Sequence, residues 1–156
     1  MLKFVMLVGI PGSGKSTWAK ERMKYRQKTF IYLSSDEIRN TIAKDTGETN
    51  RGKLNALTFK TMNETTVMCL EKGISIIYDA TNLNQKDRKH ILKKVLPLKK
   101  EKELELNCFV FNTPFEVCYE RNKRRENPVP NEYLKRYRDK FVHPTQDEGF
   151  DLIIDL

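Results

Sequence analysis

The stretch Gly9-Ile-Pro-Gly-Ser-Gly-Lys15-Ser16-Thr17 decides the fold of this 156-residue chain. It follows an apolar run at residues 4–8 and precedes a helical pattern at 15–25. A glycine-rich turn between a strand and a helix directs successive backbone N–H groups into one concavity, where they bind phosphate oxygens. We therefore predict a phosphate-binding loop whose ligand is a nucleoside triphosphate, ATP or a close relative.

The residue types within this loop suit that role. Lys15 is expected to reach the β and γ phosphates, the Ser16 hydroxyl to ligate Mg²⁺, and Thr17 to contact the α phosphate. The remaining phosphate-binding positions supply backbone groups, and glycine permits positive φ angles and close approach there; these positions are Gly9, Gly12, Ser13 and Gly14. A purely structural glycine turn is disfavoured because the full motif stands between a strand and a helix.

Apolar runs and helical patterns alternate along the rest of the chain. Most of the runs are continuously apolar, which is typical of parallel strands covered by helices on both faces. Alternation of strands and helices predicts one α/β domain over residues 1–156. The expected strands are 4–8, 30–33, 74–78, 104–111 and 150–154, and the expected helices are 15–25, 36–43, 54–71, 85–95, 115–125 and 131–141. The charged stretch 99–103 is predicted to be an exposed turn.

Composition indicates which partners, which cellular location and which cysteine chemistry to expect. Lys and Arg number 29 against 21 Asp and Glu, and the net charge of +8 favours polyanionic partners such as DNA or RNA. No stretch approaches the roughly 18 to 20 apolar residues of a membrane span, so we expect a cytoplasmic protein, in the host cytoplasm if the chain is viral. The three cysteines are widely spaced and are expected to be reduced thiols.

Polar residues directly after a strand have priority, because ligands of parallel sheets bind beyond the carboxyl ends of the strands. Asp36 and Arg39 follow the strand expected at 30–33. Asp36 is a candidate general base for a hydroxyl acceptor, and Arg39, one helical turn later, is a candidate ligand for substrate phosphate. The alternative interpretation is that Ser35 or Asp36 caps the helix and that Arg39 is solvated.

A second polar cluster follows the strand expected at 74–78. Asp79 has the position of a Walker-B acid and is predicted to orient a Mg²⁺-bound water, so that Ser16 and Asp79 are the candidate metal residues. Thr81 and Asn82 are predicted to face the acceptor.

Arginines in the segment 115–140 predict a lid. Arg121 and Arg125 are four residues apart, which places them on one face of a helix just before the helix-breaking Asn127-Pro128-Val129-Pro130. Positive charge delivered to the transferring phosphoryl group favours its transition state. A solvated basic helix is the alternative, and the phosphate loop upstream favours the lid.

Together these motifs resemble the kinase domain of the bacteriophage-type and bacterial 5′-hydroxyl polynucleotide kinases, within the adenylate-kinase-like P-loop phosphotransferases. The resemblance covers nearly the whole chain. Besides the loop at 9–18, it rests on Ser-Asp-Glu-Ile-Arg at 35–39, Asp-Ala-Thr-Asn-Leu-Asn at 79–84, Arg-Asn-Lys-Arg-Arg at 121–125, Val-Pro at 129–130 and Phe-Val-His-Pro-Thr-Gln-Asp-Glu-Gly-Phe-Asp at 141–151. The ordered set, with its final Pro-Thr-x-x-Glu-Gly-Phe-Asp, is much narrower than the loop alone.

The resemblance implies specific roles. Asp36 is the expected general base, Arg39 the ligand of an acceptor 3′ phosphate, and Arg125 the lid arginine at the transferring phosphate, with Lys15 as the other catalytic cation. Arg121 is expected on the nucleotide. Two departures bear on acceptor recognition: Ser35 stands where relatives commonly have Asn or Arg, and Ala80 where some have a second acid.

The expected fold is therefore a five-stranded parallel sheet of order 2-3-1-4-5 with helices on both faces and a helical lid. The leading hypothesis for function is ATP- and Mg²⁺-dependent phosphoryl transfer to a nucleic-acid hydroxyl, most simply a 5′ end, with separate phosphatase or ligase partners completing a repair. A kinase of a metabolite, nucleoside or modified DNA base is the first alternative. A non-catalytic NTP-binding regulatory module is the second.

Overall fold

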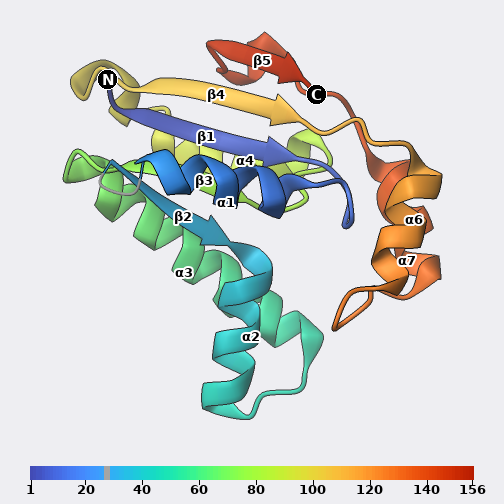
Figure 1. Cartoon of the computed structure of the whole chain (residues 1–156). Helices are drawn as coiled ribbons and strands as arrows, with labels where there is room; N and C mark the ends of the chain where they lie inside the picture. Colours follow the sequence, from blue (N-terminus) through green and yellow to red (C-terminus); the bar gives the residue numbers. More distant parts are fainter. Residues whose placement is uncertain (27–28) are drawn as a thin grey trace.

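A computed structural model describes residues 1–26 and 29–156. Its centre is a parallel sheet of five strands in the order β2-β3-β1-β4-β5 (Figure 1), which confirms the predicted topology. The strands are β1 (Lys3–Val8), β2 (Phe30–Ser34), β3 (Ser75–Asp79), β4 (Glu105–Val110) and β5 (Leu152–Asp155). Each lies within two residues of its expected bounds.

Helices connect the strands as crossovers. They are α1 (Lys15–Arg26), α2 (Ser35–Thr46), α3 (Arg51–Glu71), α4 (Gln85–Val95), α5 (Leu98–Glu101), α6 (Phe115–Lys123) and α7 (Asn131–Lys140), with a 3-10 turn η1 (Gln146–Glu148). The expected exposed turn at 99–103 is thus partly the short helix α5. In the described residues no helix is long and apolar enough to cross a membrane.

The two faces of the sheet are covered unequally. Phe4, Met6 and Val8 of β1 lie on the larger core, beneath α3 and α4. Val5 and Leu7 lie on the opposite face, where α1 contributes Trp18 and Ala19 to a smaller core. Successive side chains of a strand point to opposite faces, so continuous apolar runs supply both cores.

Helix α6 is shorter than predicted. It ends at Lys123, so Arg125 lies in the following loop and does not share a helical face with Arg121, as the spacing had predicted. The buried amide of Asn122 turns the chain: its Nδ2 donates to the Val129 carbonyl at 2.7 Å, and its Oδ1 accepts from the Val129 N–H at 3.0 Å. Two prolines in that loop also oppose a continuing helix.

One buried arginine contributes to the attachment of the C-terminal segment, alongside the β4–β5 ladder. Arg88 of α4 is fully buried and makes a two-pronged ion pair with Glu148, at 2.7 and 3.2 Å. The same guanidinium donates to the backbone carbonyls of Asn82 and Val142, each at 3.0 Å. Glu148 also closes a capping box with Thr145. The motif at 141–151 therefore serves to hold η1 and β5 against the sheet.

Candidate active site

A cleft of about 790 Å³ opens at the carboxyl ends of β1, β2 and β3. Its walls come from the phosphate loop, the start of α2, the first half of α3 and the lid loop after α6. Residues from each predicted cluster meet here: Gly12, Ser13, Gly14, Lys15, Ser16, Thr17, Asp36, Arg39, Asp79, Thr81, Arg121 and Arg125.

The phosphate loop has little room for larger residues. Gly12 has a φ of +85°, and a Cβ atom there would lie 2.7 Å from the backbone oxygen of Cys118 in α6. Helix α6 thus packs directly on the loop, which only glycine permits. The cysteines are free and buried, and burial raises the pKa of the Cys118 thiol.

Lys15 is folded back onto its own loop. Its Nζ donates to the carbonyls of Gly9 at 2.8 Å and Ile10 at 3.1 Å, and the residue is 8% exposed. Burial lowers the pKa of Lys15, while the carboxylates of Asp79 and Asp36 oppose that shift. A buried ammonium whose hydrogen-bond partners are neutral oxygens, here the two carbonyls and the Ser13 Oγ at 3.5 Å, is available to an anionic ligand such as phosphate.

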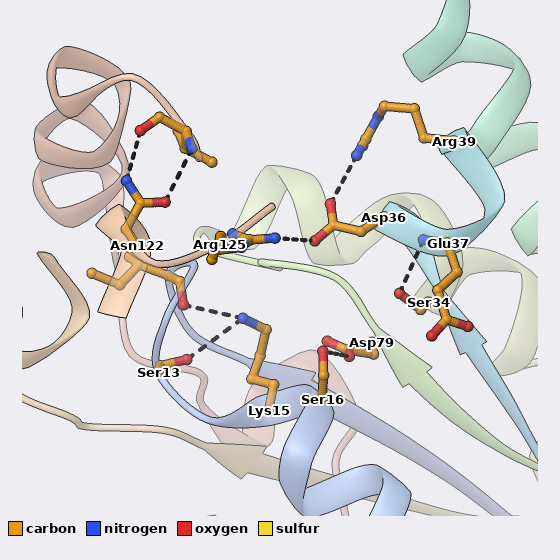
Figure 2. A network of polar contacts seen from close by, with 12 residues as sticks. Ser13, Lys15, Ser16, Ser34, Asp36, Glu37, Arg39, Asp79, Asn122 and Arg125 are labelled. Atoms are coloured by element: carbon orange, nitrogen blue, oxygen red, sulfur yellow. Dashed lines mark hydrogen bonds and ion pairs between the residues drawn. The ribbon is translucent and has the colours of Figure 1, made fainter. Parts of the chain in front are cut away.

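Ser16 and Asp79, the two candidate metal residues, lie together at the loop (Figure 2). The Ser16 Oγ donates to Asp79 Oδ2 at 3.0 Å, and the Tyr32 hydroxyl donates to the same oxygen. Burial, followed by the charge of Asp79, raises the pKa of Tyr32, which therefore remains a donor. Tyr32 was not predicted, because an aromatic residue within an apolar run gives no sign that its hydroxyl reaches another strand.

These residues fit Mg²⁺ better than a metal held by protein alone. Among the described residues there is no group of three or more His, Cys, Asp or Glu side chains that could hold a metal ion. Mg²⁺ in phosphoryl-transfer sites is held by one or two protein oxygens together with waters and substrate phosphates. One hydroxyl and one buried carboxylate, placed beside a phosphate loop, match that donor set.

Asp36 does not cap α2. The cap is Ser34, whose Oγ accepts from the Glu37 N–H at 3.3 Å, so the alternative interpretation of Ser35 or Asp36 as the cap is wrong. Asp36 lies in the first turn with its side chain 55% exposed to the cleft. Its carboxylate is therefore not needed to cap the N-terminus of α2.

Two arginines from different elements bind the Asp36 carboxylate (Figure 2). Arg125 of the lid loop donates to Oδ2 at 2.8 Å, and Arg39 donates to Oδ1 at 3.0 Å. Burial raises the pKa of Asp36, but the charges of Arg125 and Arg39 outweigh that effect and hold the pKa below its usual value. Asp36 is thus an ionised hydrogen-bond acceptor that joins the lid to α2.

Two residues of α3 that were not predicted from the sequence also line the cleft. Asn55 of α3 accepts from Arg39 Nε at 2.8 Å, and Arg51 lies close enough for its charge to lower the pKa of Arg39, after burial, which is the larger cause. Both line the cleft. Their helix starts three residues before the expected bound, so the pattern gave no reason to place Arg51 at a site.

The other predicted residues divide into those at the cleft and those away from it. Arg121 Nη1 donates to the Gly12 carbonyl at 3.3 Å, and Thr81 lines the cleft. Asn82 does not face it: its buried side chain donates to the carbonyls of Leu7 and Ala80, and its φ is +48°. Asn82 instead supports the turn after β3, because an asparagine tolerates the left-handed conformation.

The chain resembles known proteins in both sequence and fold. A family model described as an AAA domain matches residues 4–144. The L-seryl-tRNA(Sec) kinase of Methanococcus maripaludis is 27% identical over 153 residues, which is 95% of this chain and 56% of that protein. The chain thus spans little more than half the length of this curated relative.

Solved structures share the fold at lower identity. A chain of the Pnkp1/Rnl/Hen1 RNA repair complex superimposes with a TM-score of 0.72 and 22% identity, over 89% of this chain and 43% of that one. A gluconokinase from Sinorhizobium meliloti superimposes with a TM-score of 0.62 and 14% identity, over 99% and 81%. At such identities the likeness establishes the fold alone.

Proposed function

The chain belongs to the AAA-domain family whose model it matches, which is a family of P-loop kinases. From this membership we propose that the chain phosphorylates the 5′-hydroxyl of a DNA or RNA strand. The proposed donor is ATP with Mg²⁺. The observation that carries the proposal is the Asp36 carboxylate, held at 2.8 Å by the lid arginine Arg125 and at 3.0 Å by Arg39.

In the proposed reaction the acceptor hydroxyl lies against Asp36. Its oxygen bonds to the γ phosphorus while the bond from that phosphorus to the β–γ bridging oxygen breaks, and Asp36 accepts the hydroxyl proton. ADP is the leaving group. Arg125 exchanges its contact with Asp36 for the transferring phosphoryl group, where positive charge is most useful.

The donor side uses the phosphate loop. Lys15 turns from its backbone carbonyls to the β and γ phosphates, the backbone from Gly9 to Gly14, with Ser13, surrounds them, and Thr17 contacts the α phosphate. Arg121, already at the loop, binds the nucleotide. Ser16 and, through water, Asp79 would hold Mg²⁺, which neutralises phosphate charge when it is bound.

The acceptor side is built to hold a negative charge beside the reacting hydroxyl. Arg39 is oriented by Asn55 and has Arg51 as a like-charged neighbour, while Arg39 and Arg125 share the single Asp36 carboxylate, so positive charge is in excess around Asp36. A phosphate on the same nucleotide as the hydroxyl would relieve that excess of positive charge. Thr81 is proposed to contact the acceptor from the end of β3.

The net charge of +8 supports a strand substrate, and 5′ phosphorylation prepares an end for joining. A chain of the same fold belongs to the Pnkp1/Rnl/Hen1 RNA repair complex. We propose that separate phosphatase or ligase proteins act before or after this kinase.

The test is transfer of labelled γ phosphate from ATP to a panel of acceptors. The panel holds 5′-OH DNA, 5′-OH RNA, a nucleoside 3′-monophosphate and unphosphorylated nucleosides. We expect labelling of the oligonucleotides that is lost in Lys15→Ala and Asp36→Ala. Labelling of nucleosides alone would replace the proposal with a nucleoside kinase, and ATP binding without any transfer would point to a regulatory module.

A metabolite kinase is the second candidate, because the cleft volume of about 790 Å³ lies within the range of small-molecule sites. The arginine pair Arg39 and Arg51 restricts such an acceptor to one that carries a negative charge. A phosphorylated or acidic metabolite should be added to the panel. It would compete with oligonucleotides for the same arginines under either candidate, but only a metabolite kinase would transfer the label to it.

A further inference from the structure

One part of the sheet has no helix over it in the described part of the chain. On the face that carries α1, that helix packs on β2 and β3 and reaches β4 through Trp18, whose ring centroid lies 4.7 Å from that of Phe109; Figure 1 shows no helix in front of β5. Asn107 and Phe109 of β4 pair in register with Leu152 and Ile154 of β5, which places all four side chains on this face. Leu152 is 43% exposed. We call these four residues the β4–β5 face.

A pocket of about 160 Å³ lies between α1 and the sheet, next to the β4–β5 face. Its walls include Val5, Trp18, Phe30 and Phe109, and Asn107 lies among them. An apolar cavity of about 150 Å³ accepts a benzene ring. The pocket therefore has the size and the lining for one aromatic side chain.

Asn107 brings an unused hydrogen-bond acceptor to this pocket. The residue is 4% exposed, and its Nδ2 donates to Glu105 Oε1 at 2.6 Å. Its Oδ1 is buried and has no hydrogen-bond partner among the described residues. A buried polar atom is normally paired, so the pocket favours a ligand that carries a donor.

The charge at the mouth of the pocket is positive. Arg22 lies over the ring of Trp18, 4.7 Å from its centroid, and has no carboxylate partner in residues 1–26 and 29–156. Lys3, the other cation of the pocket, lies 3.8 Å from Glu105. Arg22 is therefore the uncompensated charge, and it favours an acidic ligand.

We propose that the β4–β5 face binds an acidic amphipathic helix of a partner protein, which inserts a tyrosine into the pocket. A tyrosine combines the aromatic ring that the walls accept with the O–H that Asn107 Oδ1 lacks. The helix covers Phe109, Leu152 and Ile154 with its apolar side, as α3 and α4 cover the opposite face, and its acids meet Arg22. A second copy of this chain would bring another Arg22 and repel it.

The experiment uses a designed helical peptide with an apolar stripe, a central tyrosine and glutamates on its remaining positions, titrated into the full chain. Trp18 is the only tryptophan of the chain and lines the pocket, so its emission reports binding. We expect saturable binding that weakens about tenfold when lysines replace the glutamates. A tyrosine-to-phenylalanine peptide should bind about 3- to 10-fold more weakly, because Asn107 loses its donor.

Matched variants locate the site. Arg22→Glu and Lys24→Glu change the same charge on the same helix, and only the first should weaken binding. Leu152→Glu should abolish it, whereas Leu57→Glu, at a leucine with a similar exposure of 44%, should not. Unchanged ATP affinity and circular dichroism show that each variant is folded.

Three results would overturn the proposal. They are equal binding of the acidic and lysine peptides, no change in Trp18 emission with the acidic peptide, and binding that survives Arg22→Glu. A concentration-dependent dimer in sedimentation that Leu152→Glu removes would assign the β4–β5 face to a second copy and overturn the acidic-helix partner.

Discussion

Asp36 shows how a single carboxylate acquires a chemical role from its neighbours. Ser34 caps α2, so Asp36 is not needed by the helix backbone, and the arginines that hold it come from α2 and from the lid loop. Its neighbour Glu37 has the same place in the first turn but pairs with Lys20 at the surface. Both acids lie in the first turn of α2, but only Asp36 lines the cleft.

This pair gives the first prediction. Asp36→Ala should reduce turnover about 10²- to 10⁴-fold while ATP binding remains largely intact, because a general base acts in the chemical step. Glu37→Ala removes an equivalent charge from the same helix end and should leave turnover nearly unchanged. Steady-state kinetics and ATP titration measure both. Near-normal turnover in Asp36→Ala would refute the general-base role.

The pH dependence gives a second prediction for the same residue. The two arginines hold the pKa of Asp36 below its usual 3.8, and kcat/KM reports the pKa values of the free enzyme. Asp36 therefore loses its function only as the pH falls below about 4. In Arg125→Gln, which removes one of the cations, the acid limb should move to higher pH. An acid limb that stays in place would show that Arg125 does not act on Asp36.

At the scale of elements, the lid depends on Asn122. Its amide forms both hydrogen bonds to Val129, and the loop that these bonds close carries Arg125 to Asp36. Charge and proline spacing in the sequence led to the hypothesis of a lid that carries arginines, which stays a prediction. The sequence did not predict the end of α6, because that end depends on a side chain that binds the backbone seven residues later.

We expect Asn122→Ala to lower kcat about 10- to 100-fold, since a small displacement of Arg125 weakens its contact with the transferring group. Hydrogen exchange at the Val129 amide, which donates to Asn122, should accelerate in the same variant. Asn127→Ala, at an exposed position of the same loop, is the control. Unchanged kcat despite faster exchange would separate the loop closure from catalysis.

Arg88 joins elements that are distant in the sequence. Arg88→Met leaves Glu148 without its partner in a site where Glu148 has 4% of its side chain exposed, and should cost about 3–5 kcal/mol of the free energy of unfolding. The double variant Arg88→Met/Glu148→Leu should recover part of that loss, because no unpaired charge remains. Lys89→Met, exposed on the same helix, is the control. Urea unfolding measures all three; a loss in Lys89→Met as large as that in Arg88→Met would contradict this account.

At the scale of the molecule, an excess of cations surrounds one cleft. Each phosphate neutralised on a single strand contributes about −0.7 to the slope of log K against log salt. Arg51→Ala should reduce the magnitude of that slope by about 0.7 for a 5′-OH oligonucleotide if Arg51 meets a phosphate. Lys86→Ala, exposed on α4 and absent from the cleft lining, should leave it unchanged. Equal slopes in all three proteins would place the strand elsewhere.

The overall architecture was predictable because it depends on local patterns. Continuous apolar runs set the parallel strands, and a loop that begins at Gly9 implies its own strand and helix. Contacts between distant segments were not predictable. They include the hydrogen bonds from Tyr32 to Asp79, from Arg39 to Asn55, and from Asn82 to the Leu7 carbonyl of β1. In each of these hydrogen bonds, tertiary packing determines which partner the polar side chain meets.

The ion pair between Arg88 and Glu148 also has a consequence for synthesis on the ribosome. Glu148 follows Arg88 by 60 residues, so a nascent chain holds the arginine long before its carboxylate has been translated. A charge without a partner opposes its own burial. The growing polypeptide should therefore keep α4 loosely docked, and the final consolidation of the domain should wait until residue 148 has left the exit tunnel.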